Sequence, residues 1–232
     1  MSLDIALLTD IGRKRKNNED AGIAFHYHTT SLGAGHQIYF LAVADGMGGH
    51  LAGEKASEET IRIISTSFVR VFTGLVFDRN LAETLATQIT KSIELANNKV
   101  YHLSRTVPEY SGMGTTLTVC VIVGYIGVFG NVGDSRAYLI RENKIRRVTK
   151  DHSIVQTLLD LGEITEEEAF SHPQRNVITR AVGLKEKVKV DIFQEELRPG
   201  DIILLCSDGL HDMLKDNEIL SYVLDSKTSR DA

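Results

Sequence analysis

The sequence predicts an α+β layered domain, in which helices cover antiparallel sheets. Two long amphipathic segments, 54–72 and 80–104, have helical periodicity and interrupt a chain that is otherwise made of short strand-like runs. These runs are joined by tight turns rather than by long crossovers, which favours antiparallel pairing. Helices and sheets must bury their apolar faces against each other, so we expect them to stack in layers around a core.

The remaining elements follow from apolar runs and from the turns that separate them. A polar turn covers 12–20, a glycine-rich turn covers 46–53, and Asn80 fits the N-cap position of the second helix. Two short helical stretches are expected over 153–162 and 216–226. Strands are expected over 3–8, 21–28, 37–45, 115–123, 125–133, 135–143, 144–151, 187–197 and 201–208.

Composition limits the class of protein. The 232 residues suit one globular domain, and a net charge of −5 with a sequence pI of about 5.9 argues against nucleic acid as a partner. No apolar run is long enough to cross a membrane, and the N-terminus lacks the residue order of a secretory signal. Cys120 and Cys206 each lie in an apolar run, so we expect two reduced core residues and a cytoplasmic location.

Two predicted buried strands end on the same signal, an Asp-Gly pair. They are FLAVADG, which ends at Asp45, and ILLCSDG, which ends at Asp208. A strand end fixes its last side chain, and the glycine lets the backbone turn and approach a ligand. Asp-Gly is also a common turn former, so one copy alone would indicate only a turn. With two copies, each after a buried strand, a functional site and a pair of ordinary turns are equally good interpretations.

Further carboxylates lie at neighbouring turns. Glu19 and Asp20 end the polar turn NNED, and Asp134 lies in a glycine-flanked turn between two strands. Each could be a solvated turn residue. Together, however, five carboxylates without a Cys/His ligand pattern form a hard oxygen set that suits Mg²⁺ or Mn²⁺ rather than Zn²⁺.

Such a set predicts hydrolysis of a phosphate ester. Two metals that share a carboxylate can hold a bridging water and stabilise the phosphoryl group during in-line attack. Arg15 lies just before the first carboxylates and is the best candidate for a bidentate phosphate contact. We interpret Arg13, Lys14 and Lys16 as a solvated basic patch. The GMGG turn matches neither a P-loop nor a dinucleotide-binding fingerprint, which argues against those classes.

Seven segments in order resemble the metal-dependent Ser/Thr protein phosphatases of type 2C, specifically their bacterial branch. They cover nearly the whole chain and read GRKRKNNED, VADGMGGHLAGE, SGMGTTLTV, NVGDSRAYL, TKDHS, HPQRNVITRAVG and PGDIILLCSDGL. The resemblance implies a four-layer α-β-β-α sandwich of two antiparallel sheets flanked by helices. It also implies one catalytic domain over 1–232, with a flap at about 153–180 that influences substrate choice.

The resemblance also assigns roles to the carboxylates. Asp45 would bridge two metals, Glu19 and the carbonyl of Gly46 would bind one of them, and Asp208 would bind the other. Asp20 would orient metal-bound water. The cofactors implied are two or three Mn²⁺ or Mg²⁺ ions.

Three further positions complete the implied site. Asp134 would share a third, weaker metal site with Asp208, and Arg15 would bind the phosphate. Met47 stands where many eukaryotic members carry a histidine proposed as general acid, so metal-bound water would protonate the leaving group instead. The other candidate acids, which we expect to be structural or on the surface, are His50, His152, His172 and His211.

One departure from the family pattern concerns the C-terminal region. The family places a further metal-ligand aspartate, followed by Asn, before a last apolar strand. Neither Asp216, which we expect to cap a helix, nor Asp231 matches it. We therefore expect the domain over 1–232 to lack its C-terminal helix and strand, and to bind one metal more weakly.

Hydrolysis of phosphoserine and phosphothreonine in proteins is the function that the resemblance implies, with the substrates of a Ser/Thr kinase as partners. The alternative is a catalytically impaired regulatory or binding module of the same fold, because of the absent ligand. A third hypothesis, a phosphatase acting on regulators of the anti-sigma-antagonist type, is disfavoured by the flap segment.

Overall fold

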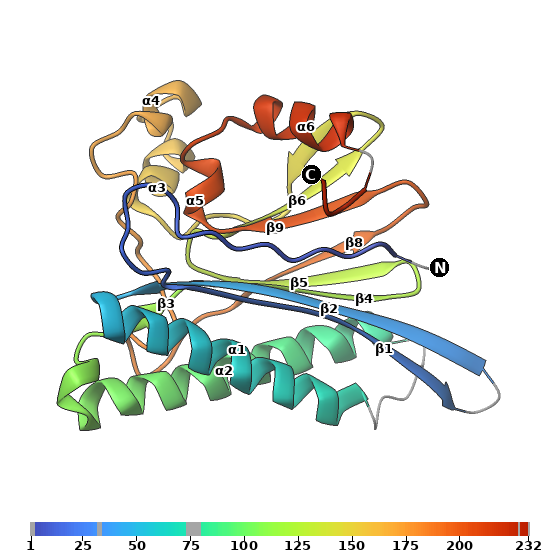
Figure 1. Cartoon of the computed structure of the whole chain (residues 1–232), viewed down its shortest axis with the longest axis horizontal. Coiled ribbons are helices and arrows are strands. Elements are labelled where there is room, and N and C mark those ends of the chain that lie inside the picture. Colours follow the sequence, from blue (N-terminus) through green and yellow to red (C-terminus); the bar gives the residue numbers. More distant parts are fainter. Residues whose placement is uncertain (1–2, 32–33, 73–79, 227, 232) are drawn as a thin grey trace.

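The computed structural model describes residues 3–31, 34–72, 80–226 and 228–231. Two antiparallel sheets lie face to face, and helices cover the outer face of each (Figure 1). The long helices α1 (His50–Phe72) and α2 (Leu81–Thr106) cover the larger sheet. The shorter α6 (Asp216–Asp225) packs on the smaller sheet. The predicted α-β-β-α sandwich is confirmed.

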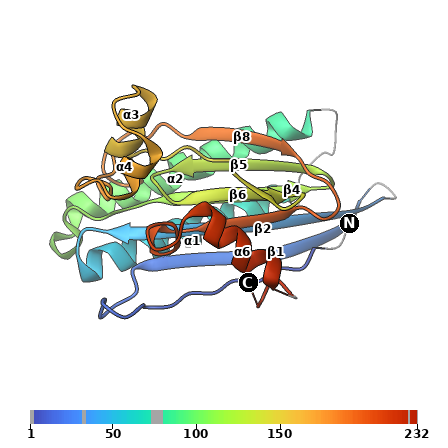
Figure 2. The ribbon, with the colours of Figure 1, turned by 90° about the horizontal axis from the view of Figure 1, so that it is seen from above.

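Strand order brings distant parts of the sequence together. The larger sheet has the order β1-β2-β4-β5-β8, with β3 paired to β2, and the smaller sheet has the order β7-β6-β9. The bounds are β1 Asp20–Ser31, β2 Ala34–Met47, β3 Gly114–Thr115, β4 Leu117–Val123, β5 Ile126–Val132, β6 Arg136–Arg141, β7 Lys144–Arg147, β8 Asp191–Glu196 and β9 Ile202–Cys206. Figure 2 shows the antiparallel strands lying roughly along one axis.

Three apolar clusters hold the layers together. Side chains alternate across a strand, so Phe40 of β2 faces the helices, where its ring packs at a tilted angle against Phe68 of α1. Its neighbour Tyr39 faces the other way, into the cluster between the sheets, which also contains Cys120. Both cysteines are free and buried, as the sequence predicts. The third cluster joins the smaller sheet to α6 through Ile219 and its neighbours.

The structure corrects several predicted boundaries. Residues 3–8 are not a strand, although Leu3 and Ile5 pack into the cluster between the sheets. Helix α1 begins at His50 rather than at residue 54, so half of the predicted glycine-rich turn is helical. Asn80 precedes α2 but its side chain makes no capping hydrogen bond. Asp216 is the first residue of α6, and Lys215 occupies the N-cap position.

Short elements that the sequence did not reveal lie near the ends of the strands. They are the 3-10 turn η1 (Pro108–Tyr110), strand β3, and α5 (Asp208–His211). The segment expected to be a flap contains α3 (Ile154–Asp160) and α4 (Glu166–Phe170). Its two ends lie side by side, because the Ile154 N–H donates to the Val177 carbonyl at 2.9 Å. Among the described residues, no helix combines the length and the apolar character of a membrane span.

Candidate metal centre

Three of the five carboxylates, those of Glu19, Asp20 and Asp45, lie where β1 begins and β2 ends. Asp20 begins β1 and lies directly opposite Asp45 of β2 in the antiparallel register. Side chains paired in this way have Cβ atoms only about 5 Å apart. The Gly46 N–H donates to the Glu19 carbonyl at 3.1 Å, which fixes the backbone before β1 against the end of β2.

The other two carboxylates reach the same end of the strands from other elements. Asp208 is the first residue of α5, directly after β9 of the smaller sheet. The preceding Ser207 donates from Oγ to Oδ2 of Asp20 at 2.7 Å, which joins residues 187 positions apart in the sequence. Asp134 lies in the turn between β5 and β6 and is buried. All five carboxylates therefore lie together at the end of the sandwich where the two sheets meet.

Electrostatics show that the carboxylates interact with one another. Burial, followed by repulsion from Asp208 and Asp20, raises the pKa of Asp45 to about 9. Burial and the charge of Asp208 raise the pKa of Asp134 to about 7. The pKa of Asp20 is also raised, mainly by burial, against the lowering effect of the Ser207 hydrogen bond. Without cations the cluster must therefore retain protons, since several ionised carboxylates cannot share a desolvated space.

The donor set fits hard divalent cations. A side-chain hydrogen bond between Asp45 and Asp208 is one of the causes that raise the pKa of Asp45, so the two carboxyl groups share a proton when no metal is bound. Carboxylate and carbonyl oxygens are the ligands that Mg²⁺ and Mn²⁺ prefer. Within the described residues, no three Cys, His, Asp or Glu side chains already converge as a complete ligand set. Binding would therefore require proton release and rotation of these side chains.

Two glycines allow Glu19 to lie close to α1. A Cβ atom added at Gly53, in the first turn of α1, would come closer to Glu19 Oε2 than real Cβ atoms approach any neighbour. A Cβ at Gly46 would meet the Gly53 carbonyl and lie 2.7 Å from the Glu19 carbonyl oxygen. At Gly46 only a residue without a side chain fits, because the contacts are with backbone, whereas at Gly53 a side chain would force the Glu19 carboxylate to withdraw. The glycine-rich stretch thus acts by close backbone approach rather than by forming a loop around a nucleotide.

Hydroxyl groups that the sequence analysis missed hold the backbone of the centre. The Asp45 N–H donates to Thr116 Oγ1 at 2.9 Å, and Thr115 Oγ1 donates to the Asp45 carbonyl at 2.8 Å. Ser57 Oγ of α1 donates to the Glu19 carbonyl at 2.6 Å. The quoted SGMGTTLTV segment contained the threonines, but nothing in their spacing indicated this contact.

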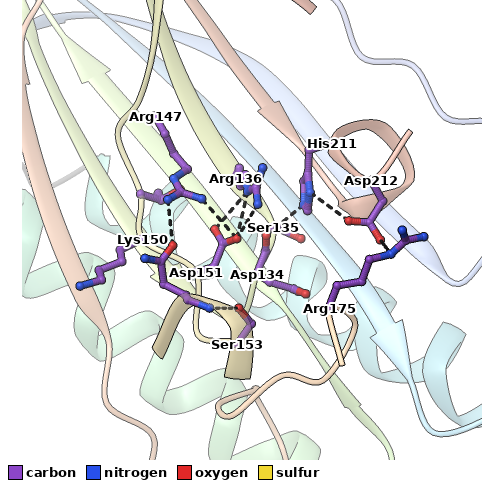
Figure 3. A network of polar contacts seen from close by, with 12 residues as sticks. Asp134, Ser135, Arg136, Arg147, Lys150, Asp151, Ser153, Arg175, His211 and Asp212 are labelled. Atoms are coloured by element: carbon purple, nitrogen blue, oxygen red, sulfur yellow. Dashed lines mark hydrogen bonds and ion pairs between the residues drawn. The ribbon is translucent and has the colours of Figure 1, made fainter. Parts of the chain in front are cut away.

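A polar network surrounds Asp134 (Figure 3). His211 of α5 lies 3.1 Å from the Asp134 carbonyl through Nε2, so this nitrogen carries the proton and donates. His211 also faces Asp212, which lies 3.5 Å from Arg175 of the expected flap segment. The network therefore links that segment to the turn that carries Asp134.

The partly buried ion pair of Arg136 with Asp151 lies beside this turn. Arg136 Nη2 and Nε donate to Asp151 Oδ2 at 2.7 and 3.0 Å, and Figure 3 shows the two side chains facing each other. Asp151 is 5% exposed, and its negative charge is one of the causes that raise the pKa of Asp134. The pair therefore holds the negative charge of Asp151 in a fixed place near the Asp134 carboxylate.

Among the described residues, the candidate phosphate ligand makes no ion pair with the carboxylates, and three of the candidate acids make structural contacts. Arg15 is exposed, and within the described residues its side chain makes no ion pair or hydrogen bond. His152 accepts a hydrogen bond from the Gly133 N–H through Nδ1 at 3.0 Å, and His172 accepts one from Gln174. These contacts, together with that of His211, are structural. The side chain of His50 lies outside the described residues.

Comparison with known proteins identifies related chains over almost the full length. A family model described as protein phosphatase 2C matches residues 14–229. The serine/threonine phosphatase stp of Listeria welshimeri is 39% identical over 221 residues, which are 95% of this chain and 82% of that protein.

Solved structures agree with this similarity. The serine/threonine phosphatase Stp1 of Staphylococcus aureus is 39% identical, with a TM-score of 0.83 over 98% of this chain and 86% of that one. The catalytic domain of the serine threonine protein phosphatase PstP, in complex with two manganese ions, is 33% identical. Its TM-score is 0.75, over 95% of this chain and 83% of that one.

Proposed function

The chain belongs to the protein phosphatase 2C family, and we propose that it hydrolyses phosphoserine and phosphothreonine in proteins with the help of divalent metal ions. The observation that carries the proposal is the cluster of buried, mutually repelling carboxylates where the two sheets meet. Its oxygen donors suit hard cations, and relatives with the same fold are named serine/threonine phosphatases. These two lines of support are independent, because one is electrostatic and the other is sequence similarity.

We assign the ligands as follows. Asp45 would be shared by two ions, Glu19 and the Gly46 carbonyl would hold one of them, and Asp208 would hold the other. Asp134 contributes with Asp208 to an outer, weaker third site. Manganese or magnesium is the proposed cofactor, which the two manganese ions of the related PstP structure support. When bound, such ions lower the pKa of water and neutralise the developing charge of the phosphoryl group.

The residues of the chain itself position the reactants. Ser207 donates a hydrogen bond to the Asp20 carboxylate, which would orient metal-bound water. Arg15, in the exposed segment that precedes Glu19, is the proposed ligand of the substrate phosphate, since its guanidinium can donate two parallel hydrogen bonds. Burial raises the pKa of Asp45, so at neutral pH its carboxyl group keeps a proton until a cation replaces that proton.

Two wider proposals accompany this function. Protein substrates of a Ser/Thr kinase are the proposed partners, in line with the names of the relatives. The cytoplasm is the proposed location, which the two free buried thiols support. A fusion to a fluorescent protein, imaged in the native host, should show a diffuse internal signal rather than a signal at the cell periphery.

Kinetics on a phosphothreonine peptide test the function directly. We expect turnover with Mn²⁺ and none after EDTA treatment. Asp45→Asn should reduce kcat by at least about a hundredfold, because removal of a group that holds transition-state charge has effects of this size. A matched control is Asp231→Asn, which changes an exposed carboxylate near the C-terminal end of the chain. Hydrolysis that is insensitive to EDTA or to Asp45→Asn would refute the proposal.

A further inference from the structure

A loop rich in positive charge is attached directly to the carboxylate centre. We define the basic loop as residues 9–18, which include the run Arg13, Lys14, Arg15 and Lys16. Asn18 Nδ2 donates to Thr9 Oγ1 at 2.6 Å and closes the two ends of the loop. The same asparagine accepts the Asp20 N–H through Oδ1 at 3.0 Å. The loop is therefore fastened to the first residue of β1, which belongs to the centre.

The turn of this loop is locally defined. The Gly12 N–H donates to Asp10 Oδ1 at 2.6 Å, and Gly12 has a φ of 71°, a left-handed conformation that favours glycine. The four basic residues follow immediately and are all exposed. Their presentation outward follows from a closed loop with a defined turn, rather than from a disordered tail.

The four cations have no partners among the residues that the structure describes. None of their side chains makes an ion pair or hydrogen bond there, although the chain as a whole carries a net charge of −5. By contrast, Arg136, Arg141 and Arg180 each pair with an aspartate. A run of unpaired positive charge beside a site for a phosphate ester is therefore free to contact the substrate.

The place of the loop in the fold limits what it can contact. Figures 1 and 2 show the dark blue loop and the α3–α4 segment at the same end of the molecule. In Figure 2 they lie on opposite sides of the strand ends, with the start of β1 and the end of β2 between them. Helix α4 carries the acidic run Glu166, Glu167 and Glu168. The end of the molecule that holds the centre is thus basic on one side and acidic on the other.

We propose that Arg13, Lys14 and Lys16 form a recognition surface for acidic side chains that flank the phosphorylated residue of the substrate. This inference rests on the proposed phosphatase function and specifies its substrate class as acidic phosphopeptide segments. An extended peptide advances about 3.3 Å per residue, so side chains two or three positions from the phosphoresidue lie about 7–10 Å away from it. Arg15, in the middle of the run, contacts the phosphate itself, which leaves its neighbours to read these flanking positions.

The expected size of the effect follows from the exposure of the loop. Exposed pairs of opposite charge contribute modestly, which corresponds to a factor of about 1.5 to 5 per pair. Two or three such pairs should give a preference of roughly tenfold for an acidic over a neutral peptide. The preference should decline with added salt, since solvent-exposed charges are screened at an ionic strength above about 0.1 M.

Three phosphothreonine peptides of equal length test the inference. They carry glutamate, glutamine or lysine at the positions flanking the phosphothreonine and are otherwise identical. With the Mn²⁺-loaded full chain at low salt, kcat/KM should rank glutamate above glutamine above lysine, with about tenfold between the first two. Arg13→Gln/Lys14→Gln/Lys16→Gln should bring the glutamate-to-glutamine ratio to within twofold of one, while Arg15 is retained.

A matched variant controls for net charge. Lys91→Gln/Lys99→Gln/Arg105→Gln removes three positive charges from the exposed face of α2, which covers the far face of the larger sheet. It should keep the full preference. Arg13→Glu/Lys14→Glu/Lys16→Glu should reverse the ranking and favour the lysine peptide. Thermal unfolding of each variant checks that the fold is retained.

The outcomes separate the inference from the function on which it rests. Equal kcat/KM values for the three peptides, with full Mn²⁺ dependence, would overturn the recognition surface and leave the phosphatase function intact. An equal loss of preference in the α2 variant would also overturn it, since overall charge would then be the cause. Absence of Mn²⁺-dependent turnover on every peptide would overturn both.

Discussion

Gly53→Ala should separate metal binding from stability. Gly53 lies in the first turn of α1, where an alanine normally stabilises a helix by about 0.5–1 kcal/mol relative to glycine. Here the new Cβ would meet Glu19 Oε2 at less than 3.0 Å, so the carboxylate must withdraw by roughly 1 Å to reach ordinary contact. The same Cβ would lie 3.0 Å from the Gly46 carbonyl carbon, which requires a shift of a few tenths of an ångström.

The two consequences differ in size. The end of the Glu19 side chain is flexible, so the free energy of unfolding of the metal-free variant should stay within about 1 kcal/mol of the wild type. The ligand geometry, however, changes by an amount that typically costs about 10- to 100-fold in metal affinity or activity. We therefore expect nearly normal stability together with a 10- to 100-fold increase in the Kd for Mn²⁺.

The assay combines titration calorimetry with urea unfolding, and a second variant isolates the cause. Glu19→Asp shortens the carboxylate by one methylene and should itself weaken binding. In that background Gly53→Ala should add less than about threefold, because the shorter side chain no longer meets the new Cβ; a double-mutant cycle measures this coupling. If Gly53→Ala binds Mn²⁺ as tightly as the wild type, or costs the same in both backgrounds, Glu19 is not the ligand that the glycine accommodates.

Three further predictions concern protons and packing. In the metal-free protein the folded-state pKa values of Asp45, about 9, and Asp134, about 7, exceed the unfolded value of 3.8, so the folded chain retains protons that the unfolded chain loses. The free energy of unfolding in EDTA should therefore fall as pH rises from about 4 to about 9, and Mn²⁺ should reverse the trend; a flat profile in urea titrations at pH 5, 7 and 9 would contradict this. Asp151→Asn leaves the Arg136 charge without its carboxylate and should cost about 3 kcal/mol, or about 6–12 °C in Tm by calorimetry, whereas a change below about 2 °C would show that the pair is not buried in solution. Ile89→Ala removes a fully buried side chain that lies against Gly130 and should cost about 2–5 kcal/mol in urea unfolding without changing the KM for a phosphopeptide; a changed KM would mean that α2 influences the site.

The buried strands were predictable because their apolar runs determine their structure locally. The run 37–45 became the central part of β2, and its alternating sides pack on the helices and on the second sheet. Residues 3–8 show the limit of this reasoning. Leu3 and Ile5 do face the core as a strand would, but among the described residues this segment forms no ladder with a neighbouring strand. Periodicity predicts which side chains are buried, whereas strand formation needs a partner that periodicity cannot identify.

The candidate site was predictable as a set of residues, but its internal contacts were not. Asp-Gly at strand ends indicated Asp45 and Asp208, and the structure brings both to the place where the sheets meet. The contact of Ser207 with Asp20 depends on how the two sheets pack against each other, and no local pattern predicts it. The close approach of Gly53 to Glu19 likewise appears only once α1 is placed against β2. The sequence alone predicts a turn for the glycine-rich stretch, because Glu19, the residue that approaches its glycines, lies elsewhere in the sequence.

Diffraction from crystals of this chain soaked in Mn²⁺ would test the central claim most directly. Anomalous difference maps should show one manganese between Asp45 and Glu19 with the Gly46 carbonyl, and a second between Asp45 and Asp208. Oxygen ligands at about 2.1–2.3 Å would agree with hard-cation coordination. Manganese absent from Asp45, or bound only at the surface, would contradict the assignment of these carboxylates as the metal centre.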